Sequence, residues 1–254
     1  MNPSLPASAC PPRPRVSVVI PAFNEERLLP ATLEAVRAAS MGFADAGWDH
    51  EWIVCDNNST DRTSEIAAAA GARVVFEPVN QIGRARNAGA GAATGDWILF
   101  VDADSRPTRG LFAEAVSTAS RPDVLAIGST IRLDGGGPSA AIAAAGWNLL
   151  SRIGGLLAGS FIMVERRAFE TIGGFSLEFY AGEELDLVRR LKAHGKPDRR
   201  GVAILHRHPL ETSARKVRLY GPMETFGFLL RAGLSPRSTL RNRESCFLWY
   251  DARR

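Results

Sequence analysis

The sequence has little cysteine and no long apolar run. Its 254 residues include three cysteines, Cys10, Cys55 and Cys246, too few and too scattered for a disulfide framework or a zinc cluster. A membrane-spanning helix needs roughly 18–20 uninterrupted apolar residues, and the nearest segment, residues 138–164, is interrupted by Arg152 and several glycines. The N-terminus lacks the charged start and apolar run of a signal peptide. These absences exclude a secreted disulfide scaffold and a polytopic membrane protein, and we expect a cytoplasmic protein.

Lysine is scarce as well, so arginine carries most of the positive charge. Only Lys192, Lys196 and Lys216 are lysines among 31 basic residues. Residues 199–254 hold 12 Lys and Arg against 4 Asp and Glu, whereas residues 1–198 hold 19 against 23. A basic C-terminal part of this kind suits an anionic partner such as a membrane surface, a sugar diphosphate or nucleic acid. A general bias of the chain toward arginine explains the same numbers.

The overall composition is that of a globular protein. Hydrophobic residues make up 45% of the chain and charged residues 23%, close to the average for soluble domains. The length suffices for one large α/β domain with a sizeable core. Four prolines between positions 6 and 14 predict a flexible leader over residues 1–14.

Short apolar runs alternate with helical patterns through the first part of the chain. This alternation predicts a mostly parallel, Rossmann-like α/β sheet flanked by helices. The expected strands are residues 16–20, 52–55, 73–76 and 97–101, separated by helices at 24–39, 63–72 and 83–93. The later part is less regular, with helices expected at 111–120, 139–150 and 185–194, a loop at 135–137, and strands at 124–132, 159–164 and 202–205.

Acidic or polar side chains follow three of the four predicted parallel strands. They are Glu25 and its neighbours, Asp56 with Asp61, and Asp102 with Asp104. Ligands of open parallel sheets bind beyond the carboxyl ends of the strands. Carboxylates gathered there can accept hydrogen bonds from a nucleoside or hold a hard divalent cation. A bare Asp-x-Asp is a weak signal, because turns after strands often contain Asp, but its position directly after WILFV favours a binding site.

Four stretches of the sequence resemble the family 2 glycosyltransferases. They are VSVVIPAFNEERLLPATLEAV, DNNSTDRT, GRARNAGAGAATGDWILFVDADS and GSFIMVERRAFETIGGFSLEFYAGEELDLVRRLKAHGK, which together extend over roughly residues 15–207. The resemblance implies a GT-A fold over residues 15–210, with a nucleotide-binding half (15–105) and an acceptor half (106–210) that has a smaller acceptor-side sheet. A basic C-terminal extension, residues 211–254, follows. The implied reaction is inverting transfer of a sugar from a nucleotide diphosphate.

The resemblance also assigns the residues that bind the nucleoside. It places Pro21, Ala22 and Phe23 at the base, with the ring of Phe23 as a stacking or edge surface. Glu25 would reach the nucleoside, and Asp56 would accept the imide N–H of the base. That contact favours uracil or guanine, and we expect UDP rather than GDP.

The diphosphate and the metal are assigned to the second acidic cluster. Asp102 would meet the ribose or the metal, with Ala103 beside it, and Asp104 would bind Mn²⁺ or Mg²⁺. Two basic residues, Arg84 and Arg86, lie where the family has a basic residue near the nucleotide, and the sequence leaves open which of them faces the site. Some members of this fold use a histidine as an extra metal ligand, a role that His206 matches.

The general base is expected in the stretch GEELDL. The family commonly has a Glu-Asp pair before an amphipathic helix, and here Glu184 stands where the Asp would be, one methylene longer. Glu184 is the first choice for the base, Glu183 the second and Asp186 the third. The alternative interpretation is an acidic helix N-terminus that only complements the helix dipole.

Partners and rival functions follow from the same features. We expect a nucleotide-diphosphate sugar donor, a sugar or lipid-linked acceptor, and no nucleic acid. The C-terminal region leaves open peripheral contact with the inner face of the membrane, or a homodimer.

A catalytically silent sugar-nucleotide binder or docking protein is the alternative to an enzyme. A nucleotidyltransferase is disfavoured because PAFNEE has no phosphate-binding glycines, and a HAD-type phosphatase because its nucleophilic Asp usually follows the first strand.

Overall fold

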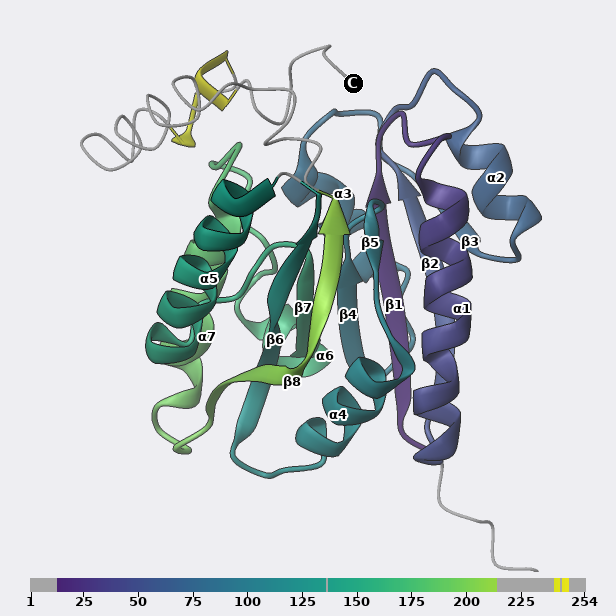
Figure 1. Ribbon diagram of the computed structural model, residues 1–254. Coiled ribbons are helices and arrows are strands. Elements are labelled where there is room, and N and C mark those ends of the chain that lie inside the picture. The colour runs from purple at the N-terminus through teal and green to yellow at the C-terminus, as the bar shows by residue number, and fades with distance from the viewer. Residues whose placement is uncertain (1–12, 136, 214–239, 243, 247–254) are drawn as a thin grey trace, which may run out of the picture.

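The computed structural model describes residues 13–135, 137–213, 240–242 and 244–246. Most of the expected leader, residues 1–14, and most of the expected C-terminal extension lie outside these residues. Figure 1 shows a sheet with helices on both faces. The strands are β1 (Arg15–Ala22), β2 (Asp49–Asp56), β3 (Arg73–Phe76), β4 (Trp97–Val101), β5 (Ser105–Arg106), β6 (Val124–Asp134), β7 (Phe161–Glu165) and β8 (Gly201–Ser213). The helices are α1 (Leu29–Asp45), α2 (Thr63–Ala69), α3 (Ile82–Gly91), α4 (Arg109–Ala119), α5 (Gly137–Gly154), α6 (Arg166–Thr171), α7 (Glu183–Gly195) and the short 3₁₀ helix η1 (Glu244–Cys246).

All eight strands belong to one sheet, in the order β3-β2-β1-β4-β7-β6-β8-β5. Strands β1 to β4 are mutually parallel, β7 runs antiparallel to both β4 and β6, and β8 runs parallel to β6. The α/β class and the mostly parallel sheet are therefore confirmed. The expected smaller acceptor-side sheet is not separate: antiparallel β7 pairs on both sides and joins the two halves into a continuous sheet.

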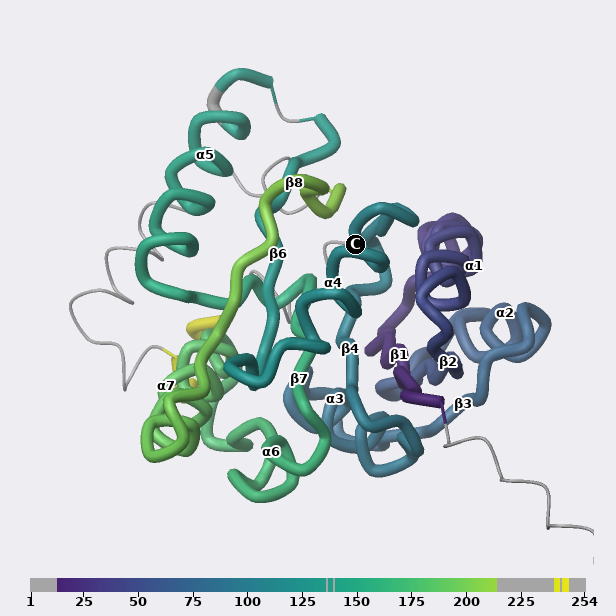
Figure 2. The backbone as a smooth tube through the Cα atoms, turned by 90° about the horizontal axis from the view of Figure 1, so that it is seen from below, coloured from purple at the N-terminus to yellow at the C-terminus, as the bar shows by residue number. Residues whose placement is uncertain are grey.

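Two hydrophobic cores lie on opposite faces of this sheet. In β1, Val16, Val18 and Ile20 pack with α1 and α4, whereas Val19 packs with the core that contains α6 and α7. Strand β4 alternates in the same way, with Leu99 on the first face. Because neighbouring side chains of a strand point to opposite faces, an uninterrupted apolar run is what a strand covered on both sides requires. Figure 2 shows these layers from below, with α1 and α3 on opposite sides of the central strands.

The predicted elements of the first half are confirmed with small shifts at their ends. Strand β1 extends past the expected stop at Pro21 and ends at Ala22, because both residues still pair with β2. Pro21 is tolerated there because it lies beyond the last pair of the β1–β4 ladder, Val19 with Phe100. Helix α1 begins at Leu29, later than expected. Both differences concern the turn that carries the expected base-binding residues.

The second half differs more from the expectation. Strand β8 continues well beyond residue 205, because its later residues pair with β6 after an irregularity between Ser129 and Ile131. Strand β5 and helix α6 were not expected. The two-residue β5 exists only through its pairing with β8, in which Ser105 lies opposite Thr212. Helix α5 starts at Gly137, inside the expected loop at 135–137. Among the helices that the structure describes, none is long and apolar enough to cross a membrane.

Candidate active site

A cavity of about 290 Å³ opens at the carboxyl ends of β1 and β4. Residues from both halves of the chain line it: Pro21, Ala22, Phe23, Glu25, Asn57, Asn80, Ile82, Ala85, Arg86, Asp102, Ala103, Asp104, Ile131, Trp147, Ala158, Gly159, Ser160, Gly182, Glu183 and Glu184. Most of the residues expected at the donor, and two of the three expected bases, therefore meet in one cavity.

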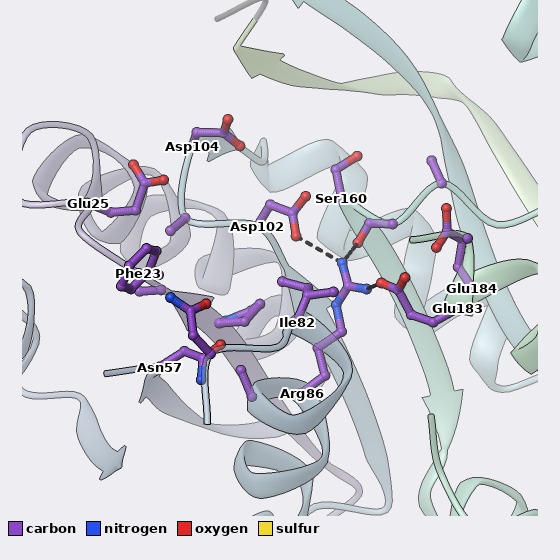
Figure 3. A pocket seen from close by; sticks show the side chains of 18 of the residues that line it. Phe23, Glu25, Asn57, Ile82, Arg86, Asp102, Asp104, Ser160, Glu183 and Glu184 are labelled. Atoms are coloured by element: carbon purple, nitrogen blue, oxygen red, sulfur yellow. Dashed lines mark hydrogen bonds and ion pairs between the residues drawn. The ribbon is translucent and has the colours of Figure 1, made fainter. Parts of the chain in front are cut away.

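The donor side is built from the turns that follow β1, β2 and β4. Because β1 and β2 are parallel and pair in register, Ala22 lies opposite Asp56, so both strands end at the same level. Asn57 then fixes the neighbouring loops: its side chain accepts a hydrogen bond from the Gln81 amide at 2.9 Å and donates one to the Val79 carbonyl at 2.7 Å. Figure 3 shows Phe23, Glu25 and Asn57 gathered on this side of the cavity.

Arg86 links the donor side to the acceptor side. Its guanidinium donates to Glu183 Oε1 at 2.6 Å, to Asp102 Oδ1 at 3.1 Å and to the Gly159 carbonyl at 2.9 Å (Figure 3). The guanidinium also lies 5.2 Å from the centre of the Phe175 ring. Burial alone would lower the pKa of Arg86, but the carboxylates of Asp102 and Glu183 outweigh it, so the side chain stays charged. Arg86 is thus the basic residue of the site.

Glycines bring the acceptor-side carboxylates close to Arg86. Gly182 precedes α7 with a φ of 72°, a left-handed conformation that glycine adopts without strain, and α7 then begins with Glu183 and Glu184. At Gly159, a Cβ atom would lie 3.2 Å from Arg86 Nη2 and 3.9 Å from the Glu184 carboxyl carbon. A larger residue at position 159 would therefore crowd the contact between these charged groups.

The three candidate bases have different surroundings. The Glu183 side chain is 5% exposed and occupied by the ion pair with Arg86. Asp186 accepts hydrogen bonds from Arg189 and Arg190 within α7 and does not line the cavity. Glu184 is partly exposed and lines the cavity. Glu183 and Glu184 thus line the cavity, whereas Asp186 pairs with arginines of its own helix.

The protonation of Glu184 is shifted toward neutral pH. Burial, followed by the negative charge of Glu183, raises the pKa of Glu184 from 4.5 to about 8, against the opposing effect of Arg86. For Asp186 burial acts in the same direction, but the hydrogen bonds from Arg189 and Arg190 outweigh it and hold the pKa below its ordinary value. The pKa values of Glu184 and Asp186 are therefore shifted in opposite directions.

The described lining of the cavity is strongly acidic. Its one positive side chain, Arg86, is accompanied by the carboxylates of Glu25, Asp102, Asp104, Glu183 and Glu184. A diphosphate entering such a cavity is repelled unless a cation offsets the charge. In the described part of the chain, no group of three or more His, Cys, Asp or Glu side chains could hold a metal by itself.

Four of the expected site residues are not brought to the cavity. Asp56 is buried at the end of β2, where its Oδ1 accepts the Ser59 amide at 2.9 Å. The Arg84 side chain donates a hydrogen bond from Nε to Oε1 of Gln81. His206 is exposed on the irregular part of β8 that contains Pro209, because the strand loses its regular pairing with β6 there. Asp186, as described above, is the fourth.

Several lining residues were missed by the sequence analysis. Trp147 and Ile131 form part of the acceptor side, and Asn57 and Asn80 part of the donor side. Trp147 lies on an alanine-rich helix with nothing in its local pattern to mark it. Its ring nitrogen is buried and has no hydrogen-bond partner among the residues that the structure describes. Asn57 could have been found, since it directly follows Asp56 at a strand end.

Comparison with known proteins identifies the family. Residues 17–173, more than half of the chain, match the model for glycosyl transferase family 2. The chain is a member of this family. An uncharacterised glycosyltransferase of Mycobacterium tuberculosis is 42% identical over 95 residues, which are 37% of this chain and 39% of that protein. The chain spans about two fifths or less of the length of the curated relatives that it matches.

Solved structures show that this family 2 member has the GT-A fold. A mannosyltransferase from Pyrobaculum calidifontis, in complex with GDP-mannose and Mn²⁺, superimposes with a TM-score of 0.66 at 20% identity, over 88% of this chain and 63% of that one. Glucosyl-3-phosphoglycerate synthase from M. tuberculosis, in complex with Mn²⁺, UDP-glucose and phosphoglyceric acid, superimposes with a TM-score of 0.60 at 24% identity. The match covers 89% of this chain and 78% of that one. At these identities the likeness concerns the fold alone.

Proposed function

We propose that this chain transfers a sugar from a nucleotide diphosphate sugar to an acceptor hydroxyl, with inversion at the anomeric carbon and with UDP preferred over GDP. The observation that carries the proposal is the placement of Asp102 and Asp104 on one side of a single cavity and Glu184 on the other. Inversion in one displacement needs the leaving group and the base on opposite sides of the reacting carbon. In this cavity the two aspartates proposed to hold the metal and the proposed base lie on opposite sides, as that displacement requires.

The donor nucleotide is assigned to the side of the cavity at the ends of β1 and β2. Phe23 supplies a ring for the base, and Glu25, which is 7% exposed, lies beside it. Asp56 does not line the cavity but lies opposite Ala22, which does. It is proposed to accept the imide N–H of uracil while its Oδ1 also accepts the Ser59 amide. The two solved structures above contain UDP-glucose and GDP-mannose, so nucleotide choice is open to test.

A divalent cation fits the acidic cluster of this cavity. Asp102 and Asp104 are partly exposed and offer carboxylate oxygens, the ligands that Mn²⁺ and Mg²⁺ favour. Asp102 and Asp104 would hold the cation together with ligands from outside the protein, such as the donor diphosphate and water. When bound, the cation would offset the charge of the departing diphosphate. Solved structures of the phosphoglycerate synthase contain Mn²⁺ or Mg²⁺.

The proton transfer is assigned to Glu184. In its ionised form Glu184 accepts the proton of the acceptor hydroxyl while the hydroxyl oxygen bonds to the anomeric carbon. The bond from that carbon to the diphosphate oxygen breaks, and its electron pair leaves with the nucleoside diphosphate. Arg86 donates hydrogen bonds to Glu183 and to Asp102. Glu184 is therefore the carboxylate of the pair that is assigned to accept the proton. The acceptor is a sugar or lipid-linked hydroxyl that meets Trp147 and Ile131.

The experiment is a transfer assay that detects release of UDP or GDP from a panel of their sugars, with and without Mn²⁺. We expect turnover with UDP-sugars that chelation abolishes, and little with GDP-sugars. Asp104→Ala should lose metal-dependent turnover and metal-dependent UDP binding, while its melting temperature without ligands stays close to that of the unsubstituted chain. Asp45→Ala, at an exposed carboxylate on α1 that pairs with Arg109, is the matched control.

The outcomes separate the proposed enzyme from its alternative. UDP binding without turnover for every sugar and acceptor tested would favour the catalytically silent binder. Unchanged metal dependence in Asp104→Ala would contradict the metal assignment.

A further inference from the structure

Helix α5 has two faces of opposite character. On the inner face, Ala140, Ala144 and Ser151 are buried, and the Asn148 side chain bonds the Ile131 amide at 2.8 Å and the Ile131 carbonyl at 2.9 Å. These contacts fasten the helix to β6. The same face supplies Trp147 to the cavity wall.

The outer face of α5 is apolar and exposed. Ile142 is 74% exposed, Leu149 59%, Leu150 61% and Ile153 79%. Their spacing of 7, 8 and 11 residues places all four on one side of the helix. They are four of the nine large hydrophobic residues found exposed in the described chain. Figure 2 shows α5 at the periphery, beyond β6 and β8. A contiguous apolar face of this kind marks an interaction site.

Two exposed basic side chains lie beside this face. Arg152 is the one ionisable residue of the 18 in α5, and the Lys192 amine donates a hydrogen bond to the Gly154 carbonyl at the end of the helix. Apolar side chains flanked by arginine and lysine suit an anionic lipid surface.

We propose that the outer face of α5, formed by Ile142, Leu149, Leu150 and Ile153, docks on the surface of a bilayer that contains anionic lipids. The helix lies in the interface and does not cross it, in keeping with the absence of a spanning helix among the described residues. Because the inner face of α5 carries Trp147, docking places the cavity on the other side of this helix, one helix diameter (~10 Å) from the lipid surface. The proposal goes beyond the transfer reaction, and vesicle binding tests it without any nucleotide.

The first test is cosedimentation of the full chain with vesicles of phosphatidylcholine alone, or mixed with phosphatidylglycerol. We expect binding to the mixed vesicles that weakens at high salt. The double variant Leu149→Ser/Ile153→Ser should bind at least about tenfold more weakly. Met41→Ser/Phe76→Ser, which removes two exposed apolar side chains from α1 and β3, should bind as the unsubstituted chain does. No binding by the unsubstituted chain, or equal binding by the α5 variant, overturns the proposal.

The second test determines whether Ile153 contacts the lipid, a second copy of the chain or another part of the same chain. An environment-sensitive fluorophore is attached to Ile153→Cys in a Cys10→Ser background, where the remaining Cys55 and Cys246 are buried. We expect the emission of a water-exposed dye for the protein alone, and a blue shift when the mixed vesicles are added. A blue shift without vesicles that dilution reverses would mean that a second copy covers the face. A blue shift without vesicles that dilution leaves unchanged would mean that another part of this chain covers it. Both results overturn the proposal.

Discussion

At the scale of single residues, neighbouring carboxylates of one helix turn differ in what they contact. Glu183 is held by Arg86, Asp186 by Arg189 and Arg190, and Glu184 is directed to the cavity. All three side chains are acidic; the family resemblance ranked Glu184 first, and the structure shows how the contacts of the three differ.

Removing the carboxylate of Glu184 tests its proposed role as the base. A positioned general base contributes about 10²–10⁴ in rate, so Glu184→Gln should lose at least about a hundredfold in turnover. Its dissociation constant for UDP, measured by calorimetry, should stay nearly unchanged, because the donor is held elsewhere in the cavity. Asp186→Asn is the matched control and should keep its turnover. A mild effect of Glu184→Gln beside a severe one of Glu183→Gln would move the assignment to Glu183.

The raised pKa of Glu184 also predicts how activity depends on pH. Burial and Glu183 raise this pKa to about 8, and the base must be ionised to accept a proton. Turnover should therefore rise with pH and level off above about 8, measured with saturating donor. A flat profile between pH 6 and 9 would contradict the assignment.

The same shift has a consequence for stability. Between pH 4.5 and about 8 the folded chain retains a proton on Glu184 that the unfolded chain has released, so stability falls with rising pH. Glu184→Gln carries no such charge. Its melting temperature should exceed that of the unsubstituted chain by more at pH 8.5 than at pH 5; equal differences at both pH values would argue against a raised pKa.

At the scale of elements, close packing of α1 against α4 depends on a glycine. A Cβ atom on Gly42 would lie 2.5 Å from the Arg109 carbonyl oxygen and 2.8 Å from the Ala113 nitrogen. Both are backbone atoms, which cannot rotate away as a flexible side chain can. The two helices must therefore separate to admit a methyl group.

Gly42→Ala should lower the free energy of unfolding measured in urea. Overpacking costs about 1–3 kcal/mol, which exceeds the gain of about 0.5–1 kcal/mol from replacing a helical glycine by alanine. Gly146→Ala in α5 is the matched control, since a Cβ there meets nothing within 4 Å. The control should stabilise the protein by about 0.5–1 kcal/mol. If both variants raised the free energy of unfolding equally, α1 and α4 would separate to admit a methyl group at no cost in stability.

At the scale of the whole molecule, Arg86 joins the two halves of the domain. It extends from α3 and pairs with Asp102 after β4 and with Glu183 at the start of α7. The side chains of Arg86 and Glu183 are 3% and 5% exposed. Removing one partner of a buried ion pair leaves the other charge uncompensated, at a cost of about 3–5 kcal/mol.

Arg86→Met should therefore lower the free energy of unfolding by about 3–5 kcal/mol, measured by urea denaturation. Arg189→Met, which removes a 78% exposed arginine paired with Asp186, should change it by about 0–1 kcal/mol. If both variants lowered the free energy of unfolding by similar amounts, the ion pairs of Arg86 would not stabilise the contact between the two halves.

The sequence by itself determined the α/β class, the order of the early strands and helices, and the acidic turns after β1 and β4. These features are local: an apolar run covered on both faces, a helical period and a turn residue lie within a few positions of one another. The resemblance of those turns to family 2 glycosyltransferases then placed Phe23, Asp102 and Asp104 where the cavity has them.

Only the tertiary structure decided which residues of the later chain complete the site. Ser105 and Thr212 pair across 107 positions, and Arg86 meets Glu183 across 97. No local pattern records such contacts, so the full length of β8, the choice of Arg86 over Arg84 and the presence of Trp147 in the cavity could not be predicted. The separation of Glu184 from Glu183 depends on the same contacts, because the ion pair with Arg86 occupies one carboxylate and leaves the other to face the cavity.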